Sequence, residues 1–206
     1  MYRFSLLLIA FLLTGCGPEA PLDVKGTDIT HSAEFKTTPP AGKRHLALTD
    51  HNGHPVTLGS FKSKVIVLFF GYTHCPDVCP TTLSDMASAI KLLAPADAAR
   101  VQVLFASVDP ERDTPETLKA YVPYFHPDFL GLYGTPAQIK QAAQEFKIVY
   151  RKHIEPGATG YLVDHSAGSY VLDWQGNLRL YLPFALPPAD IAHDLTVLIR
   201  SGKGAA

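Results

Sequence analysis

The sequence lacks the charge that would mark a nucleic-acid-binding protein. It carries 18 Lys and Arg residues against 19 Asp and Glu residues, for a formal net charge of −1 over 206 residues. No basic patch, internal repeat or long run of one charge appears, so the composition gives no support to nucleic-acid binding. Cysteine is also scarce, and the three cysteines divide unevenly, with one near the start and two close together.

The chain also lacks an apolar run long enough for a membrane-spanning helix. Its longest candidate near the start, residues 4–13, has about half of the roughly 20 residues that such a helix needs. Arg3 precedes this run, and Leu13-Thr14-Gly15-Cys16 matches a lipobox. Residues 1–15 therefore resemble a bacterial lipoprotein signal peptide, with a spanning anchor or a plain secretory signal as the alternatives. We expect acyl chains on Cys16 to tether the exported protein to a cell membrane, facing the periplasm.

Composition and length divide the rest of the chain into a tether, one domain and a tail. Residues 16–44 begin with Cys16 and are rich in Pro, Gly and Thr, which is typical of a flexible tether. Residues 45–200 are long enough to bury the core of a single domain. Residues 201–206 are expected to form a C-terminal tail.

The segment around the two remaining cysteines predicts a buried strand followed by a helix. The apolar run Val65–Phe70 is typical of a central strand that is buried on both faces. It leads through Gly71 to Cys75-Pro76-Asp77-Val78-Cys79-Pro80, and we expect Pro80 at the first helical position. Apolar residues then recur at helical spacing, namely Leu83, Met86, Ala87, Ile90 and Leu93.

The two thiols thus lie where a core strand ends and a helix begins. Backbone N–H groups and the helix dipole at that position favour thiolate over thiol, so Cys75 and Cys79 are interpreted as reactive or metal-binding. The alternative is a structural disulfide. It would close a loop of about five residues and contribute only about 2 kcal/mol, which a domain of this size does not need.

A second buried strand is predicted at Val101–Val108, parallel to the first because a right-handed crossover joins them. Both strands then end at the same sheet edge, so Asp109 is expected near Cys75. In the following segment Thr114 is the expected N-cap of a helix that starts at Pro115. Helix capping explains this segment in one interpretation. In the other, Asp109 or Arg112 supports the thiol site or a docking surface.

The remaining elements complete a mixed sheet with helices on both faces. The pattern predicts a hairpin over residues 45–61 with its turn at 50–53, a helix at Pro136–Phe146, a loop at Glu155–Gly160, a hairpin formed by Ser169–Trp174 and Asn177–Leu182, and a helix at Pro188–Arg200.

Two thiolates that hold a soft metal need another donor, and two of the nine histidines are candidates. His74 is next to Cys75, but adjacent side chains usually point apart. His165 precedes the strand that begins near Ser169, and this strand is expected beside the central one. Its entry loop could place the imidazole over the two sulfurs. Spacing alone leaves both histidines as candidates for the third ligand.

Three segments together resemble the Sco/SenC family of copper-binding proteins. They are residues 71–81 (GYTHCPDVCPT), 107–114 (SVDPERDT) and 163–166 (VDHS), and the resemblance covers most of residues 41–200. It implies a thioredoxin-like α/β fold with an additional N-terminal β-hairpin. It also implies one copper ion, Cu(I) or Cu(II), on ligands that match Cys75, Cys79 and His165. Asp109 and Asp164 are candidates for contacts that support these ligands.

The chemistry of these residue types agrees with the resemblance. Thiolates and imidazole suit copper, and three protein ligands leave a position at which an incoming thiolate can exchange. Structural zinc usually takes four ligands. Thioredoxin-like oxidoreductases usually use Cys-x-x-Cys opposite a cis-proline, whereas residues 162–182 contain no proline and, by resemblance, place His165 there. This difference favours copper handling over general thiol exchange.

The resemblance implies a metallochaperone that delivers copper to the dinuclear copper centre of cytochrome c oxidase subunit II, outside the cytoplasmic membrane. A periplasmic copper donor or thiol reductase would be a further partner. One alternative is an enzyme, a thiol–disulfide reductase of the target's copper-ligand cysteines that uses Cys75 and Cys79 as its redox pair. Another is a redox or copper sensor that signals through a partner.

Overall fold

The computed structural model describes residues 25–28, 42–154, 156–157 and 160–202. The strands are β1 (Thr27–Asp28), β2 (Gly42–Lys43), β3 (Ala47–Asp50), β4 (Pro55–Thr57), β5 (Val65–Gly71), β6 (Val101–Ser107), β7 (Leu130–Tyr133), β8 (Tyr150–His153), β9 (Leu162–His165), β10 (Ser169–Leu172) and β11 (Asn177–Leu182). The helices are the 3-10 helix η1 (Leu58–Phe61), α1 (Val78–Leu92), α2 (Pro95–Ala98), α3 (Pro115–Phe125), α4 (Pro136–Phe146) and α5 (Pro188–Ser201).

The described residues form one nine-stranded mixed sheet and a separate two-stranded sheet. The large sheet has the order β1-β11-β10-β5-β6-β7-β3-β4, with β2 also paired to β11. At its centre β5 and β6 run parallel, from Val65 beside Val101 to Gly71 beside Ser107, and both strands are buried along their whole length. A strand that is covered on both faces has no side that faces water, so all of its side chains can be apolar. The apolar runs of β5 and β6 therefore suit the centre of the sheet.

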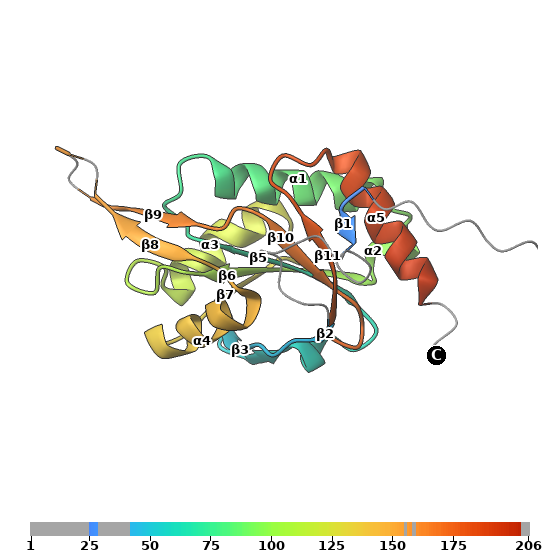
Figure 1. Cartoon of the computed structure of the whole chain (residues 1–206), viewed down its shortest axis with the longest axis horizontal. Coiled ribbons are helices and arrows are strands. Elements are labelled where there is room, and N and C mark those ends of the chain that lie inside the picture. The colour runs from blue at the N-terminus through green and yellow to red at the C-terminus, as the bar shows by residue number, and fades with distance from the viewer. Residues whose placement is uncertain (1–24, 29–41, 155, 158–159, 203–206) are drawn as a thin grey trace, which may run out of the picture.

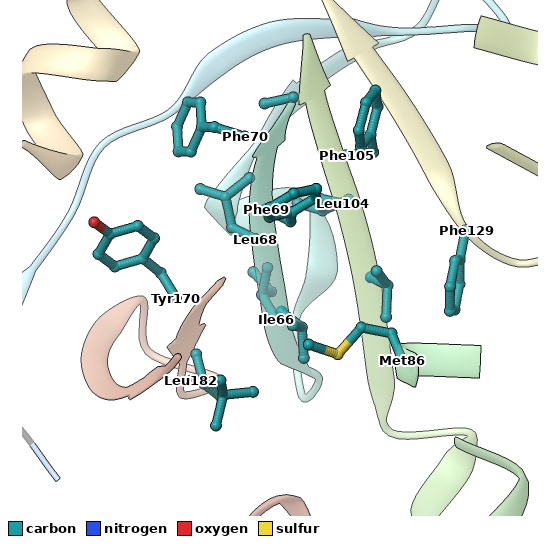
Figure 2. Packing of buried hydrophobic residues seen from close by; sticks show 14 of the residues in the cluster. Ile66, Leu68, Phe69, Phe70, Met86, Leu104, Phe105, Phe129, Tyr170 and Leu182 are labelled. Atoms are coloured by element: carbon teal, nitrogen blue, oxygen red, sulfur yellow. The ribbon is translucent and has the colours of Figure 1, made fainter. Parts of the chain in front are cut away.

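Helices cover both faces of this sheet, which confirms the expected layers (Figure 1). Helix α1 packs against α5 and α3 on one face, and α4 lies on the other. Side chains of β5 alternate between the two layers. Phe70 contacts Phe146 of α4 at a ring-centroid distance of 5.6 Å, whereas Phe69 contacts Phe105 at 6.0 Å. Figure 2 shows Leu68 and Phe70 on one side of β5 and Met86 of α1 on the other.

The predicted hairpins and helices are present, and several of their boundaries differ from the expected ones by one or two residues. Strands β3 and β4 pair antiparallel, and so do β10 and β11. The side chain of Thr114 accepts a hydrogen bond from the Thr117 N–H, as expected for an N-cap. Helix α1 begins at Val78, so the prediction that Pro80 takes the first helical position was wrong. Pro80 still lies in the first turn, where its missing N–H would have no helical partner.

The pattern did not reveal β7 or the β8–β9 hairpin, which flanks the loop expected at Glu155–Gly160. Strand β8 has the sequence Tyr-Arg-Lys-His, and its side chains are exposed or half-buried. Such a strand lacks the apolar alternation from which a half-buried strand is recognised. Among the described residues, β8 and β9 pair only with each other, antiparallel, from Tyr150 beside His165 to His153 beside Leu162.

Parts of the segment predicted as a tether add to the sheet. Strand β1 pairs with Tyr181 and Leu180 of β11, and β2 pairs with the other end of the same strand. The N–H groups of Lys25 and Gly26 donate to the buried carboxylate of Asp194 in α5. The lipobox with Cys16, the signal peptide and residues 203–206 of the tail lie outside the described residues. Among the helices that the structure describes, none combines the length and apolar character needed to cross a bilayer.

Candidate metal centre

The two cysteines lie together at the edge of the sheet where β5 ends. Cys75 is in the turn that follows β5 and is partly exposed, whereas Cys79 is in the first turn of α1 and is fully buried. Both are free thiols. The Cys79 N–H donates to the Cys75 sulfur at 3.4 Å, because the first N–H groups of a helix have no partner within the helix. The helix start therefore holds the first sulfur over the second.

His165 of the β8–β9 hairpin completes the group. It is the last residue of β9 rather than part of a loop, and its Nε2 lies 3.4 Å from Sγ of Cys79. The ligand atoms of Cys75, Cys79 and His165 all lie within 4.8 Å of one another. The structure thus brings together two sulfurs and one imidazole nitrogen, a group that could hold one metal ion.

The imidazole of His165 is turned toward the sulfurs by its other nitrogen. Its Nδ1 lies 3.0 Å from the carbonyl oxygen of Ser166. Because a carbonyl only accepts, Nδ1 carries the proton and donates it, and the lone pair of Nε2 faces Cys79. The ring also makes edge-to-face contacts with Phe69 and Tyr72, each at a centroid distance of 5.9 Å. This orientation suits a metal ligand.

The two thiols differ in charge. A hydrogen bond from the Cys79 thiol lowers the pKa of Cys75 to about 3, with further help from backbone N–H groups, although burial opposes the shift. The same shared proton, together with burial, raises the pKa of Cys79. The metal-free site is therefore a thiolate paired with a thiol, and a metal ion held by both sulfurs would displace one proton.

Gly71 makes room for the buried sulfur. A Cβ added to this residue would lie 2.7 Å from the Phe105 ring and 2.8 Å from Sγ of Cys79, and both distances are shorter than a normal carbon contact. The last residue of β5 must therefore lack a side chain if the helix start is to pack against the strand. Close packing thus explains why a glycine precedes the turn that carries Cys75, which is called the thiol turn below.

Asp113 holds the thiol turn, and sequence reasoning did not single it out. Its carboxylate is 2% exposed and accepts hydrogen bonds from Oγ1 of Thr73 at 2.7 Å and from Oγ of Ser107 at 2.6 Å. It also accepts from the backbone N–H of Thr73. Burial raises the pKa of Asp113, and these hydrogen bonds oppose that shift. The available signal was its place in the 107–114 segment, four residues after Asp109.

The structure separates the other candidate residues from the three donors. His74 is half-exposed, with its Nδ1 3.1 Å from Oγ1 of Thr73, and lies outside the donor group. The carboxylate of Asp164 contacts His153 and Arg151 on the exposed face of the hairpin. Asp109 is fully buried, but its carboxylate bonds to side chains that hold the β8–β9 hairpin rather than to the thiol turn.

Comparison with known proteins agrees with this geometry. A family model described as SCO1/SenC matches residues 36–200. The chain belongs to the SCO1/SenC family. It is 42% identical over 131 residues to the mitochondrial protein SCO2 of Saccharomyces cerevisiae, covering 63% of this chain and 43% of that protein. It is 38% identical over 132 residues to a SCO2-like protein of Rickettsia conorii, covering 63% of each. The chain thus spans less than two thirds of these relatives.

Solved structures of the SCO1/SenC family share the fold and include copper complexes. Bradyrhizobium japonicum ScoI with copper bound is 38% identical, with a TM-score of 0.69 over 76% of this chain and 99% of that chain. Yeast Sco1 with copper bound is 30% identical, with a TM-score of 0.70 over 79% and 90%. These matches confirm the family and the thioredoxin-like fold that the sequence motifs implied.

Substituting Gly71 with alanine tests the packing of the buried sulfur. We expect Gly71→Ala to lower the free energy of unfolding by about 1–3 kcal/mol, because overpacking a filled core displaces side chains and backbone. Urea denaturation of the metal-free protein measures the change. Gly59→Ala is the control, since its Cβ would lie at an ordinary 3.6 Å from Thr57 and should change stability by less than about 0.5 kcal/mol. Equal effects of the two changes would contradict the packing role of Gly71.

Proposed function

We propose that this SCO1/SenC protein is a copper metallochaperone that binds one copper ion through Cys75, Cys79 and His165. It delivers the ion to the dinuclear copper centre of cytochrome c oxidase subunit II. The observation that carries the proposal is the convergence of the three ligand atoms within 4.8 Å of one another. The two sulfurs belong to the body of the domain and the imidazole to the β8–β9 hairpin. Cys79 and His165 are 86 residues apart in the sequence.

The donor set favours copper over other metals. Two sulfurs and one imidazole are soft to intermediate ligands that accept Cu(I) and Cu(II). Structural zinc sites usually have four protein ligands, and only these three donors form a metal-binding group within the described part of the chain. The copper-bound structures of Bradyrhizobium ScoI and yeast Sco1 support the same choice of metal.

The burial of the ligands suits transfer of the ion rather than storage. Cys79 is fully buried, whereas Cys75 is partly exposed at the rim of the site. A thiolate from the target can approach from the side of Cys75 and bind the copper at its open position. The Cys75 sulfur can then leave the ion, and His165 and Cys79 follow. Exchange between ligands of similar softness keeps the ion bound at every step.

The proposal places the protein outside the cytoplasm, attached to a membrane by acyl chains on Cys16. The lipobox supports this location, and so does a 28% identical SCO1/SenC family lipoprotein of Bacillus anthracis, whose structure matches with a TM-score of 0.65. In the native bacterium, Cys16→Ser should move the protein out of the membrane fraction. Continued membrane attachment of that variant would refute lipidation as the anchor.

Removal of the imidazole tests the ligand set. We expect His165→Ala to weaken copper binding by at least about 100-fold, since loss of a group that merely supports a ligand already costs 10–100-fold. Competition with a Cu(I) chelator measures the dissociation constant of the purified full chain. His153→Ala is the matched control because His153 lies on the same hairpin and outside the donor group. Unchanged binding in His165→Ala would rule out the proposed ligands.

Mixing the copper-loaded protein with the copper-free soluble domain of oxidase subunit II tests delivery. We expect copper to leave the chain and the absorption bands of the dinuclear centre to appear in the target. The same target domain with its copper-ligand cysteines oxidised to a disulfide is the control, because it offers no thiolate to the copper and should receive none. Copper that stays on the wild-type chain in the presence of the reduced target would refute the delivery function.

One observation also favours thiol–disulfide exchange at the same site. Cys75 is partly exposed and its pKa is low, while Cys79 is buried behind it. In this reaction the Cys75 thiolate attacks a target disulfide and releases one target thiolate. Cys79 then resolves the mixed disulfide, which leaves a Cys75–Cys79 disulfide and a target reduced by two electrons. Cys79→Ser should trap the mixed disulfide with an oxidised target if the protein is a reductase, and a missing adduct would exclude it.

A further inference from the structure

The β8–β9 hairpin carries His165 and forms a sheet separate from the large one in the part of the chain that the structure describes. The two strands pair only with each other in the described part of the chain, and Figure 1 shows them extending away from the body of the domain. Residues 147–149 and 166–168 join the base of the hairpin to α4 and β10. Beyond that base, side-chain contacts must fix the direction of the hairpin, because two strands are only marginally stable by themselves.

We infer that Arg112, together with Asp109 and Tyr161, positions the β8–β9 hairpin so that His165 reaches the two sulfurs. This inference rests on the proposed function, because it assigns a role in building the same copper site. Arg112 is a positioning residue, since it touches none of the three donor atoms. The three residues are called the hairpin clamp below.

Arg112 joins the end of β6 to the start of β9. Its Nε donates to Oδ2 of Asp109 at 2.5 Å, and its Nη1 donates to the backbone carbonyl of Tyr161 at 2.9 Å. Its Cζ also lies 3.6 Å from the centre of the Tyr161 ring, which is a close cation–π contact. One guanidinium thus makes three contacts in fixed directions, which a lysine cannot reproduce.

Asp109 anchors the clamp to the body of the domain. Its side chain is fully buried, and its Oδ1 accepts a hydrogen bond from the Tyr161 hydroxyl at 2.7 Å. Its backbone N–H donates at 3.0 Å to Oγ of Ser107, the last residue of β6. A buried carboxylate is costly unless it is paired and hydrogen-bonded, so Asp109 strongly favours the one arrangement in which Arg112 and Tyr161 both reach it.

The clamp lies close enough to His165 to set its position. Tyr161 directly precedes β9, and His165 ends the same four-residue strand. Tyr161 and His165 are therefore four residues apart, joined by a strand that is paired along its length with β8. The guanidinium of Arg112 also faces Tyr72 at 5.7 Å, and the Tyr72 ring packs edge-on against His165 at 5.9 Å. The clamp therefore supports the imidazole along the strand and through one intervening ring.

Helix capping alone does not account for this segment. Thr114 caps α3 through its own side chain, whereas the polar contacts of Arg112 run to Asp109 and to the hairpin. Asp113, the next residue in the sequence, accepts a hydrogen bond from Thr73 of the thiol turn instead. In the 107–114 segment, Asp113 thus holds the thiol turn and Asp109 holds the β8–β9 hairpin.

Arg112→Lys is the main test, because it keeps a cation beside the buried Asp109 while removing the bond to the Tyr161 carbonyl and the planar stack. In the copper-free full chain we expect amide hydrogen exchange across residues 160–168 to become at least several-fold faster. We expect Cu(I) binding, measured by chelator competition, to weaken about 10–100-fold, as for other groups that orient a metal ligand. The thiolate-to-Cu(II) absorption band should shift as well, since the imidazole would sit differently.

Two further variants complete the experiment. Arg151→Lys is the matched control, because Arg151 is an exposed arginine on the same hairpin that contacts Asp164 and should change none of the three readouts. Tyr161→Phe removes only the hydroxyl that bonds to Asp109 and should change them in the same direction by a smaller amount. It remains informative if Arg112→Lys folds poorly by circular dichroism.

The outcomes separate the clamp from the proposed function. If wild type binds copper through His165 but Arg112→Lys and Tyr161→Phe match it within twofold in affinity, exchange rate and spectrum, the clamp is refuted and the function stands. If wild type binds no copper, the proposed function fails. In that case faster hydrogen exchange in Arg112→Lys still supports the clamp, and unchanged exchange overturns it.

Discussion

The contact between Sγ of Cys79 and Nε2 of His165, 3.4 Å long, is the constraint on which the rest of the site depends. The sulfur belongs to the body of the domain, where α1 starts against the end of β5. The nitrogen belongs to a hairpin outside the large sheet. Each side needs its own support. Gly71 admits the sulfur by lacking a side chain, and the carbonyl of Ser166 turns the imidazole. A metal ion held between them would add a further link between the hairpin and the body of the domain, which are joined by residues 147–149 and 166–168 and by the contacts of Arg112.

Two buried aspartates explain how both substructures are held from one place. Strands β5 and β6 are parallel and end together, so the segment after β6 lies beside the thiol turn. Asp113 receives the hydrogen bonds of Thr73 and Ser107, and Asp109 receives those of Arg112 and Tyr161. Burying a carboxylate costs free energy unless it is hydrogen-bonded. Each aspartate therefore restricts its neighbours to arrangements that satisfy it. The three donors are thereby pre-organised before any metal arrives.

Much of the fold and of the candidate site followed from local patterns. The runs in β5 and β6, the helical spacing after Cys79 and the N-cap at Thr114 each depend on neighbouring residues alone, and the structure contains them. The start of α1 moved by two residues, because a proline fits anywhere in the first turn. The β8–β9 hairpin was missed because its exposed, charged strand has no apolar alternation. Asp109 was expected near Cys75, but its carboxylate bonds to Arg112 and Tyr161, and these partners gave no signal in the sequence.

The sequence by itself determined the chemistry: two cysteines at a helix start, a histidine in a recognisable segment, and a family resemblance that the comparisons confirmed. Spacing alone left His74 and His165 open, although one of them is the immediate neighbour of Cys75. Only the tertiary structure shows which of the two histidines lies beside the sulfurs. It places His165 against Cys79 across 86 residues and leaves His74 half-exposed beside Asp113. The physical reason is that the direction of a side chain depends on the packing of its own strand or turn, whereas sequence distance says nothing about that packing.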